Sequence, residues 1–419
     1  MAGKKNTANR KSTPWLKFVS TRDGRKVRNL AYDPSAVRPG TKKRKNTAVT
    51  APPVNTNSGS VRLPDDVIAE IRDVASFVKS IQHENAAVAS RGSGELALSI
   101  SPALAEAQRR VESVGEKVLA VVDADMRARL GSDKYENLLS DARDEVDDAD
   151  KICAGLDKRH EEIDAMNAKK PPRTASAEYA EWADNMKEAI REYNKDVDIV
   201  NGRASFTYSR KLARERAASI NSVLSSVRRM GGDFEVEDFS AKTTVKKLKD
   251  ESLGLPADWI DLSNRAGGLY VTGSSGGGML GSYRHVGITR LPKRVSQKAG
   301  MAYHTGAVMK LGAPPHNTVH ELGHRFEHND PQLLNLSKAF IASSNQPGAT
   351  GRWVGKEMWQ FRDTSNSVTK DSYTHVIYDD LGATEVVSTG LEGLIGGGAK
   401  SGKPDRRRDA HTMGLLATM

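Results

Sequence analysis

The sequence feature that most constrains the fold is the segment 318–328, which reads Thr-Val-His-Glu-Leu-Gly-His-Arg-Phe-Glu-His. It contains an H-E-x-x-H motif formed by His320, Glu321 and His324. Residues four apart in an α-helix lie one above the other on the same face, so two such imidazoles can bind one Zn²⁺. The glutamate between them is then placed to act as a base on a metal-activated water. The motif therefore requires a helix at this position and predicts a metal site.

The residues around the motif favour a short helix. Pro314 and Pro315 precede the motif and Pro331 follows it, and prolines are common at helix boundaries. The expected helix is therefore roughly four turns long. The histidines lie beside an apolar stripe that can face a core, formed by Val319, Leu322 and Phe326.

Two features inside this helix have more than one explanation. Gly323 is unfavourable in a helix, so we expect a close neighbour, such as a strand, that needs the missing side chain. Thr318 and Glu321 have the spacing of a capping box, which would explain the glutamate without any chemistry. In that alternative, the segment is a surface helix with incidental histidines.

A zinc site needs a third protein ligand, and the residues after the motif do not supply it. In an H-E-x-x-H-x-x-G-x-x-H arrangement, Glu327 stands where glycine is needed and Asp330 stands where the last histidine belongs. His328 lies a further turn along the same helix, where it cannot converge with the first two histidines, and it is expected to be solvated. The third ligand should therefore come from a distant segment.

The segment 382–392 is the best source of that ligand. Its apolar residues predict a buried helical face, formed by Val386, Val387, Leu391 and Leu394. The opposite face is polar and consists of Glu385, Ser388, Thr389 and Glu392. Glu385 lies early in this helix and is the first candidate, with Ser388 and Thr389 supporting it. Glu392 and Asp380 are weaker candidates, and an ordinary solvated face is the alternative.

His320-Glu-x-x-His324, followed after a long insertion by a helix with Glu385, resembles the gluzincin branch of zinc metallopeptidases. The segment Ala-Thr-Glu-Val-Val-Ser-Thr-Gly-Leu-Glu, residues 383–392, resembles zincin-like proteins encoded among bacteriophage structural genes. The resemblance covers roughly residues 204–419. It implies that His320, His324 and Glu385 bind Zn²⁺ and that Glu321 is the general base.

The resemblance also implies an oxyanion stabiliser and an acidic partner for the ligands. Tyr378, seven residues before Glu385, is the catalytic candidate that supplies a phenol to the developing oxyanion. Packing is the alternative role for Tyr378, and His375 and Tyr373 are rival candidates. Many gluzincins have an acidic residue four positions after the ligand glutamate, and here that position is Thr389, which departs from the pattern.

Short strands are expected before the metal helix. The residues 268–271, 282–289 and 303–311 have strand composition, and Gly-rich segments lie between them. In zincins an edge strand beside the metal helix can pair with an extended peptide. Residues 397–403 fit G-x-x-x-x-G-K, but Pro404 follows instead of Ser or Thr, so a phosphate-binding loop is rejected.

The region 61–203 has helical periodicity in several stretches. Apolar residues recur every three or four positions over 61–82, 104–121, 138–156 and 179–200. They include Val67, Ile71, Val74, Val78 and Ile81 in the first stretch, and Val111, Val114, Val118 and Val121 in the second. The expected structure is an elongated α-helical bundle or antiparallel coiled coil. We assign a further helix over 210–230 to the region that follows.

Residues 1–60 are rich in Lys, Arg, Asn, Thr, Ser, Pro and Gly and are expected to be a disordered basic arm. Residues 1–50 hold 14 Lys and Arg against 2 Asp and Glu, a net charge of +12, whereas the whole chain has +10. The basic character therefore belongs to the arm, which could contact nucleic acid or an acidic protein surface. No recognition motif accompanies the charge.

Together these features predict an α+β fold with three parts: a basic arm (1–60), a helical region (61–203) and a zincin-like metallopeptidase domain (204–419). The expected function is zinc-dependent hydrolysis of a protein or peptide by metal-activated water, in phage particle assembly or after delivery. The alternatives are a phage structural protein whose zincin domain binds metal without cleaving, and a nucleic-acid-associated protein that acts through its arm.

Composition limits the compartment. The single cysteine, Cys153, excludes an internal disulfide framework, and no apolar run is long enough to cross a membrane. The expected place is the cytoplasm of a bacterial host, with the virion as a second location if phage structural proteins are partners.

Overall fold

The computed structural model describes most of residues 61–419 and divides the chain into two compact units, 1–57 and 58–419. The gaps after residue 60 are 91–94, 173, 204–206, 274–281, 285–287, 312–316, 345–349, 354–357, 362–373, 379–381 and 397–404. In the first unit, β1 (Phe18–Ser20) and β2 (Lys26–Arg28) pair in antiparallel orientation. The rest of the predicted basic arm lies outside the described residues.

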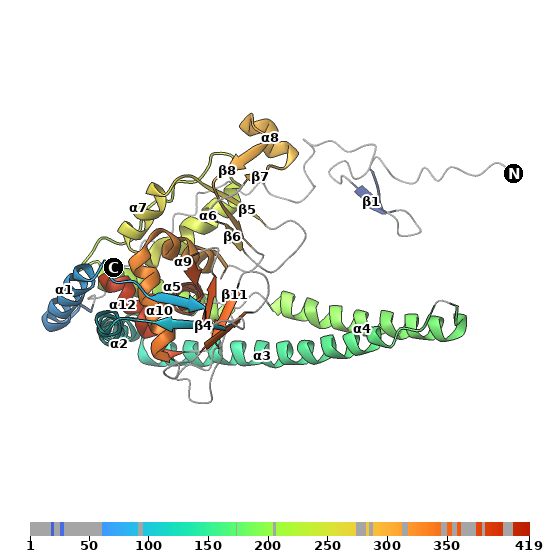
Figure 1. Ribbon diagram of the computed structural model, residues 1–419, viewed down its shortest axis with the longest axis horizontal. Coiled ribbons are helices and arrows are strands. Elements are labelled where there is room, and N and C mark those ends of the chain that lie inside the picture. Colours follow the sequence, from blue (N-terminus) through green and yellow to red (C-terminus); the bar gives the residue numbers. More distant parts are fainter. Residues whose placement is uncertain are drawn as a thin grey trace. The chain divides into compact units, whose positions relative to one another are not determined.

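The second unit is mostly helical and contains small sheets, an α+β arrangement (Figure 1). Its helices before residue 300 are α1 (Asp65–Ser80), α2 (Pro102–Leu130), α3 (Ser132–Ala168), α4 (Ser176–Arg203), α5 (Thr207–Leu224), α6 (Lys242–Glu251), the 3₁₀ turn η1 (Ser252–Gly254), α7 (Ala257–Arg265) and α8 (Lys293–Ala299). The later helices are α9 (Asn317–Asn329), α10 (Pro331–Ser344), α11 (Val386–Leu391), the π-helical turn η2 (Glu392–Gly396) and α12 (Arg406–Thr418).

The predicted helical periodicity is confirmed over α1 to α4. All five apolar positions predicted in 61–82 are buried. In α2 the prediction of Val121 was wrong, because Val122 and Met126 are buried instead and Val121 is only partly buried. A straight helix has 3.6 residues per turn, so its buried stripe drifts from a strict seven-residue repeat over 29 residues. Helices α3 and α4 run side by side (Figure 1).

The described residues of this unit form three sheets. The largest has the order β13-β12-β11-β10-β4-β3 and is antiparallel throughout. Its strands are β3 (Ala87–Ser90), β4 (Glu95–Ser99), β10 (Thr350–Trp353), β11 (Met358–Phe361), β12 (Val376–Tyr378) and β13 (Ala383–Thr384). A second sheet has the order β5-β9-β6, formed by β5 (Leu269–Gly273), β9 (Ala307–Leu311) and β6 (Ser282–Arg284). The third pairs β7 (Ile288–Arg290) with β8 (Tyr303–Thr305).

The three predicted strand segments before the metal helix therefore form β5 to β9. Residues 282–289 were expected as one strand, and the structure describes two, β6 and β7, in different sheets. The strands of the largest sheet, β3, β4, β10, β11, β12 and β13, were not predicted. The first four join a segment near residue 90 to β12 and β13, which lead directly into Glu385.

One hydrophobic core includes residues from both 61–203 and 204–419. Helices α2 and α12 pack at backbone contact, because a Cβ at Gly115 would lie 1.8 Å from the carbonyl oxygen of Ala410. A Cβ at Gly414 would likewise lie 1.9 Å from the carbonyl oxygen of Val111. Glycine at both positions thus allows the last helix of the chain to lie directly on α2.

The face of α9 that points away from the histidines is held by two kinds of contact. Phe326 packs against Phe234 and Trp259, with ring centroids 6.3 Å and 5.2 Å away. Arg325 is buried, and its guanidinium donates to the carbonyl oxygens of Ser263 and Gly267 at the end of α7. The guanidinium of Arg325 is stabilised there because a helix C-terminus favours a cation. The contact therefore restricts the rotation of α9 about its own axis. None of the helices in the described residues has the length and hydrophobicity that crossing a membrane requires.

Candidate metal centre

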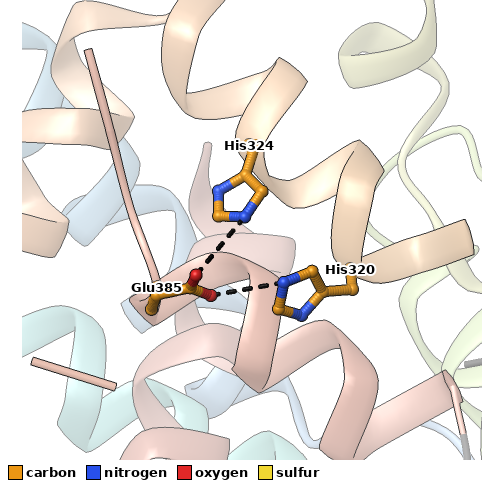
Figure 2. Close-up of side chains that lie close together, drawn as sticks. All are labelled: His320, His324 and Glu385. Atoms are coloured by element: carbon orange, nitrogen blue, oxygen red, sulfur yellow. Dashed lines mark ion pairs between the residues drawn. The ribbon is translucent and has the colours of Figure 1, made fainter. Parts of the chain in front are cut away.

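Helix α9 places the two motif histidines on one face, as the sequence predicts. The ring centroids of His320 and His324 lie 5.0 Å apart with their planes nearly perpendicular. His324 is buried, and the side chain of His320 is 13% exposed. The apolar stripe is fully buried on the other side of the helix. The two imidazoles therefore point together to the side of α9 that faces α11 (Figure 2).

Glu385 reaches the same point from the large sheet. It follows β13, its main-chain N–H donates to the carbonyl oxygen of Val376 in β12, and it stands at the N-cap position of α11 rather than inside the helix. Glu385 Oε2 lies 3.3 Å from His320 Nε2, and Oε1 lies 3.7 Å from His324 Nε2 (Figure 2). The expected convergence of two imidazoles with one distant carboxylate is therefore present.

The donor set fits a divalent metal ion. One ligand atom from each of His320, His324 and Glu385 lies within 4.8 Å of the other two. In a tetrahedral zinc site with bonds of about 2.0–2.1 Å, ligand atoms are roughly 3.3 Å apart. The nitrogen–oxygen separations of 3.3 Å and 3.7 Å are close to that spacing. Two imidazoles and one carboxylate could hold a metal ion without a change of fold.

Close packing of α9 on α11 explains the glycine in the motif. A Cβ on Gly323 would lie 2.5 Å from Ser388 Cα and 2.6 Å from its main-chain nitrogen. A close neighbour was predicted, but the expectation of a strand was wrong, because the neighbour is helix α11. The missing side chain lets the backbone of α11 approach α9 closely enough for Glu385 to meet the imidazoles.

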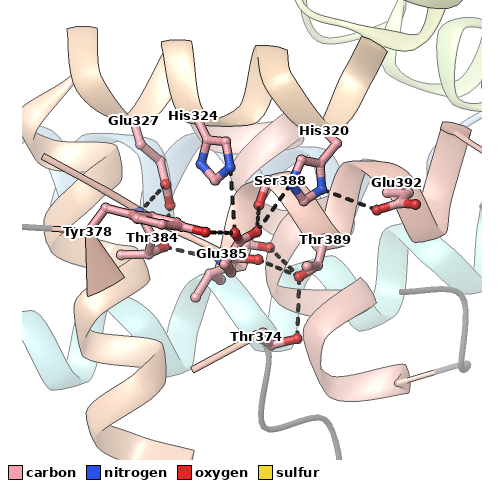
Figure 3. Close-up of polar contacts among 11 residues, drawn as sticks. His320, His324, Glu327, Thr374, Tyr378, Thr384, Glu385, Ser388, Thr389 and Glu392 are labelled. Carbon is pink, nitrogen blue, oxygen red and sulfur yellow. Dashed lines mark hydrogen bonds and ion pairs between the residues drawn. The ribbon is translucent and has the colours of Figure 1, made fainter. Parts of the chain in front are cut away.

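The ligand carboxylate is surrounded by hydrogen-bond donors (Figure 3). The Tyr378 hydroxyl donates to Glu385 Oε1 at 2.5 Å, and the Ser388 hydroxyl donates to Oε2 at 2.7 Å. The ring of Tyr378 lies edge to face with His324, with centroids 5.5 Å apart. Donors of this kind orient a ligand carboxylate before any ion binds. Ser388 therefore supports Glu385, as the sequence predicts.

Glu392 contacts the other side of the His320 ring. Its Oε2 accepts a hydrogen bond of 3.1 Å from His320 Nδ1, which leaves Nε2 directed at Glu385. Such a bond selects the imidazole tautomer whose Nε2 lone pair can bind a metal. Glu392 was predicted as a weaker ligand candidate, and it instead orients a ligand. An acidic side chain thus contacts His320 from a position three residues after Thr389.

The polar face predicted for 382–392 is buried rather than solvated. Glu385, Ser388 and Thr389 are all fully buried, so the alternative of an ordinary solvated face is wrong. The Thr389 hydroxyl donates to the main-chain oxygen of Glu385 and contacts the Thr374 hydroxyl at 3.3 Å. Thr389 thus supports the backbone of the ligand and not its carboxylate.

The burial of several carboxylates in one place calls for a positive charge. Glu321, Glu327, Glu385 and Glu392 are at most 4% exposed. No Lys or Arg contacts the first three of these within the described part of the chain. Isolated buried carboxylates are strongly unfavourable unless they are paired, protonated or bound to a metal. A divalent cation between the imidazoles and Glu385 would compensate this charge.

The pKa shifts of His320 and Glu385 also favour a positive charge between these two side chains. Burial opposes a charge on His320, but Glu385, the hydrogen bond to Glu392, and Glu321 outweigh it and raise the pKa of His320 to about 10. Burial also opposes a charge on Glu385, yet both histidines and the Tyr378 and Ser388 hydroxyls hold its pKa below the ordinary value. A site that stabilises a proton on His320 and a charge on Glu385 also favours a cation between them.

His324 and Glu321 are affected mainly by burial. Burial lowers the pKa of His324 to about 4, so its imidazole is in the neutral form that binds metals. Burial, together with repulsion from Glu385 and Glu392, raises the pKa of Glu321 to about 8. A value near neutrality suits a group that accepts and returns a proton.

The capping-box explanation of Glu321 is wrong. Thr318 lies inside α9, and its buried hydroxyl has no hydrogen-bond partner among the described residues. Glu321 likewise forms no hydrogen bond with a described side chain. The glutamate therefore does not serve the helix end.

The remaining candidates from the sequence have different positions. His328 is half-buried beside Gly382 rather than fully solvated, and His375 is fully buried. Asp380 and Tyr373 lie outside the described residues. Glu327 was considered only as a departure from another motif, yet its carboxylate accepts hydrogen bonds from the main-chain nitrogen and the hydroxyl of Thr384. Its position three residues after His324, on the same helix, was the signal that could have identified it.

Comparison of the chain with family models, curated proteins and solved structures finds no match. Any function proposed for this chain therefore rests on the geometry of this centre.

Proposed function

We propose that this protein is a zinc-dependent peptidase that hydrolyses a protein substrate. The observation that carries the proposal is the convergence of His320, His324 and Glu385 at one buried point. Two histidines and a glutamate form the donor set of zinc peptidases that keep a fourth position for water or substrate. A zinc ion bound there acts as a Lewis acid, which makes the scissile carbonyl more electrophilic and water more acidic.

Glu321 is the proposed general base. It lies on α9 directly after His320, and no described side chain holds its carboxylate in a hydrogen bond. In the proposed reaction, this carboxylate accepts a proton from the attacking water and then delivers it to the leaving amine. A cation at the ligands would lower the pKa of Glu321 from about 8 and favour the ionised base.

Tyr378 is the proposed oxyanion stabiliser. Its ring packs against His324, and its hydroxyl donates to Glu385 Oε1. To donate to a substrate oxyanion, the hydroxyl would have to leave Glu385, while Ser388 keeps its own bond to the carboxylate. The proximity of the hydroxyl to the ligands supports this role.

The proposed setting is a bacteriophage particle, during assembly or after delivery into a bacterial cell. The resemblance of residues 204–419 to zincin-like proteins among phage structural genes supports it, and phage structural proteins are the corresponding partners. The second candidate function is a structural protein whose centre binds metal without cleaving. The long, largely exposed helices α3 and α4 favour it, since they offer surface for assembly rather than for catalysis.

Metal content and peptidase activity of single variants test both functions. Wild type and Glu321→Gln are expected to hold one zinc ion, whereas His324→Ala and Glu385→Ala lose it. His328→Ala is the matched control on the same helix and should keep the ion. Glu321→Gln should lower activity on an unfolded protein substrate by about 10²–10⁴-fold, because it removes the base.

Two outcomes would count against these assignments. An equal zinc content in wild type, His324→Ala and Glu385→Ala would exclude the ligand set. Zinc in the wild type without any cleavage that depends on Glu321 would favour the structural protein over the peptidase.

A further inference from the structure

Besides the ligands, one buried carboxylate joins the two segments that build the centre. Glu327 lies on α9 one turn after His324 and is fully buried. Its Oε2 accepts a hydrogen bond of 2.6 Å from the main-chain nitrogen of Thr384, and its Oε1 accepts one of 2.6 Å from the Thr384 hydroxyl (Figure 3). Both oxygens of the carboxylate thus accept a hydrogen bond from Thr384 of β13, and the Ser337 side chain of α10 also stabilises the ionised form.

Thr384 extends this contact across the ligand. Its hydroxyl oxygen also accepts a hydrogen bond of 3.1 Å from the main-chain nitrogen of Val386. The residues immediately before and after Glu385 are therefore both tied to Glu327, one directly and one through the hydroxyl. The main-chain nitrogen of Glu385 itself donates to the carbonyl oxygen of Val376. Hydrogen bonds therefore hold the backbone before, at and after Glu385.

The helix that carries Glu327 also carries both histidine ligands. A bond between Glu327 and Thr384 therefore sets the position of the carboxylate ligand relative to the imidazole ligands. Two hydrogen bonds from one residue to the same carboxylate restrict the orientation of that residue. The link thus joins the two segments whose side chains lie 3.3 Å and 3.7 Å apart in the centre.

Glutamate is suited to this position because Thr384 presents two donors. A glutamine has only one acceptor oxygen, so its amide group would face one of those donors. Burying a carboxylate that contacts no Lys or Arg in the described part of the chain is unfavourable, and burial raises its pKa to about 7. An uncharged residue would fill the space at lower cost, so a purely structural role does not explain the choice of glutamate.

We infer that Glu327 is a positioning residue that presets Glu385 for metal binding through Thr384. The inference rests on the proposed zinc centre. Residues that orient metal ligands in this indirect way typically change metal affinity by about 10- to 100-fold when they are replaced. Glu327 would thus set the affinity of the centre without touching the ion.

The test compares zinc affinities of purified full-length variants, measured by competition with a chromophoric chelator. Glu327→Gln should bind zinc about 10- to 100-fold more weakly than wild type. Thr384→Val keeps the main-chain donor but lacks the hydroxyl, so its affinity should fall by a smaller factor. Thr384→Ser restores the hydroxyl and should recover most of what Thr384→Val loses.

Asp125→Asn is the matched control for the loss of a buried carboxylate. Asp125 is fully buried in α2 and accepts hydrogen bonds from Ser219 and Arg129, so its replacement should lower stability. It should nevertheless leave zinc affinity at the wild-type value. Cobalt(II) absorption spectra add a readout of ligand geometry, and only the Glu327 and Thr384 variants should change them.

Folded Glu327→Gln with wild-type zinc affinity and an unchanged cobalt spectrum would overturn the inference. If Glu327→Gln does not fold, Thr384→Val and Thr384→Ser test the inference instead. Equal zinc affinities of these two variants would also overturn it. A wild-type chain that binds no zinc would instead overturn the proposed function, and this inference with it.

Discussion

The metal centre and the pair of helices α3 and α4 use charged residues in opposite ways. In α4, Glu188 and Arg191 pair on the surface with side chains 55% and 70% exposed. In the centre, Glu321, Glu385 and Glu392 are buried beside His324, and the side chain of His320 is 13% exposed. Charged residues make up 28% of the chain, so their presence in a segment does not by itself indicate a site.

The difference shows that burial, and not charge pattern, distinguishes the residues of the candidate centre from those of α4. A surface ion pair contributes little because water solvates both partners equally well in the unfolded chain. A buried carboxylate loses that solvation and persists only where a compensating group is present. The two regions should therefore respond differently to metal removal, to substitution and to pH.

Removal of metal should loosen the centre and leave α3 and α4 unchanged. At a free zinc concentration of about a thousand times the dissociation constant, binding stabilises the native state by about 4 kcal/mol. Hydrogen exchange of amides in α9 and α11 should therefore become faster when zinc is chelated, while exchange in α3 and α4 stays the same. Equal acceleration in both regions would remove the distinction between them.

Alanine in place of glycine should have opposite effects in the two regions. Gly323→Ala places a Cβ 2.5 Å from Ser388 Cα, and this overpacking should destabilise the protein by about 3 kcal/mol and weaken zinc binding. Gly155 in α3 is exposed and has open space around it. Gly155→Ala should therefore stabilise that helix by about 0.5–1 kcal/mol. Chemical denaturation measures both changes, and a tolerated Gly323→Ala would contradict the close packing of α9 on α11.

Buried and exposed histidines should differ in their response to pH. His411 in α12 is fully buried and stacked on Phe340, and burial, with repulsion from Arg407, lowers its pKa to about 3. The unfolded chain, in which a histidine has a pKa of about 6.5, therefore binds more protons below neutrality. The contribution of this group is complete above about pH 6.5 and is lost as the pH falls toward 3.

Between pH 7 and pH 5 that loss amounts to about 2 kcal/mol. Denaturation of wild type and His411→Gln at both pH values should show the difference, because the variant lacks this part of the pH dependence. His160→Gln, at an exposed position in α3, is the control and should follow the wild type. Parallel pH profiles for all three proteins would contradict the role of burial.

The smallest effect is expected for a surface ion pair. Glu188→Gln removes the partner of Arg191 in α4 and should change the free energy of unfolding by less than about 0.5 kcal/mol. Denaturation in low and high salt measures the change. A loss above 1 kcal/mol would show that the charges of α4 matter more than their exposure suggests.

Residues close in sequence were the ones that could be predicted correctly. The spacing of His320 and His324 requires only helical geometry, and Gly323 indicated a close neighbour because glycine is unfavourable in a helix. The apolar stripes of α1 and α2 followed from the same geometry, with one error at Val121. These features depend on contacts within a few residues.

The ligand environment could be predicted only in part. Glu385 was identified from the polar face of its predicted helix and by resemblance, whereas Glu392 was taken for a weaker ligand candidate and Glu327 had no assigned role. Glu392 meets His320 across 72 residues of sequence, and Glu327 meets Thr384 across 57. No local pattern encodes such distances, because they depend on β13, α11 and η2 packing against α9.

The amino-acid sequence alone determined which groups can bind a metal and which faces of the helices are apolar. These properties follow from side-chain chemistry and from a helical repeat of 3.6 residues, and both act locally. Tertiary structure alone decided that a carboxylate from a distant sheet meets the two imidazoles and that the surrounding acids are buried. Desolvation depends on everything that packs around a group, so the properties of these residues arise only when the whole core is assembled.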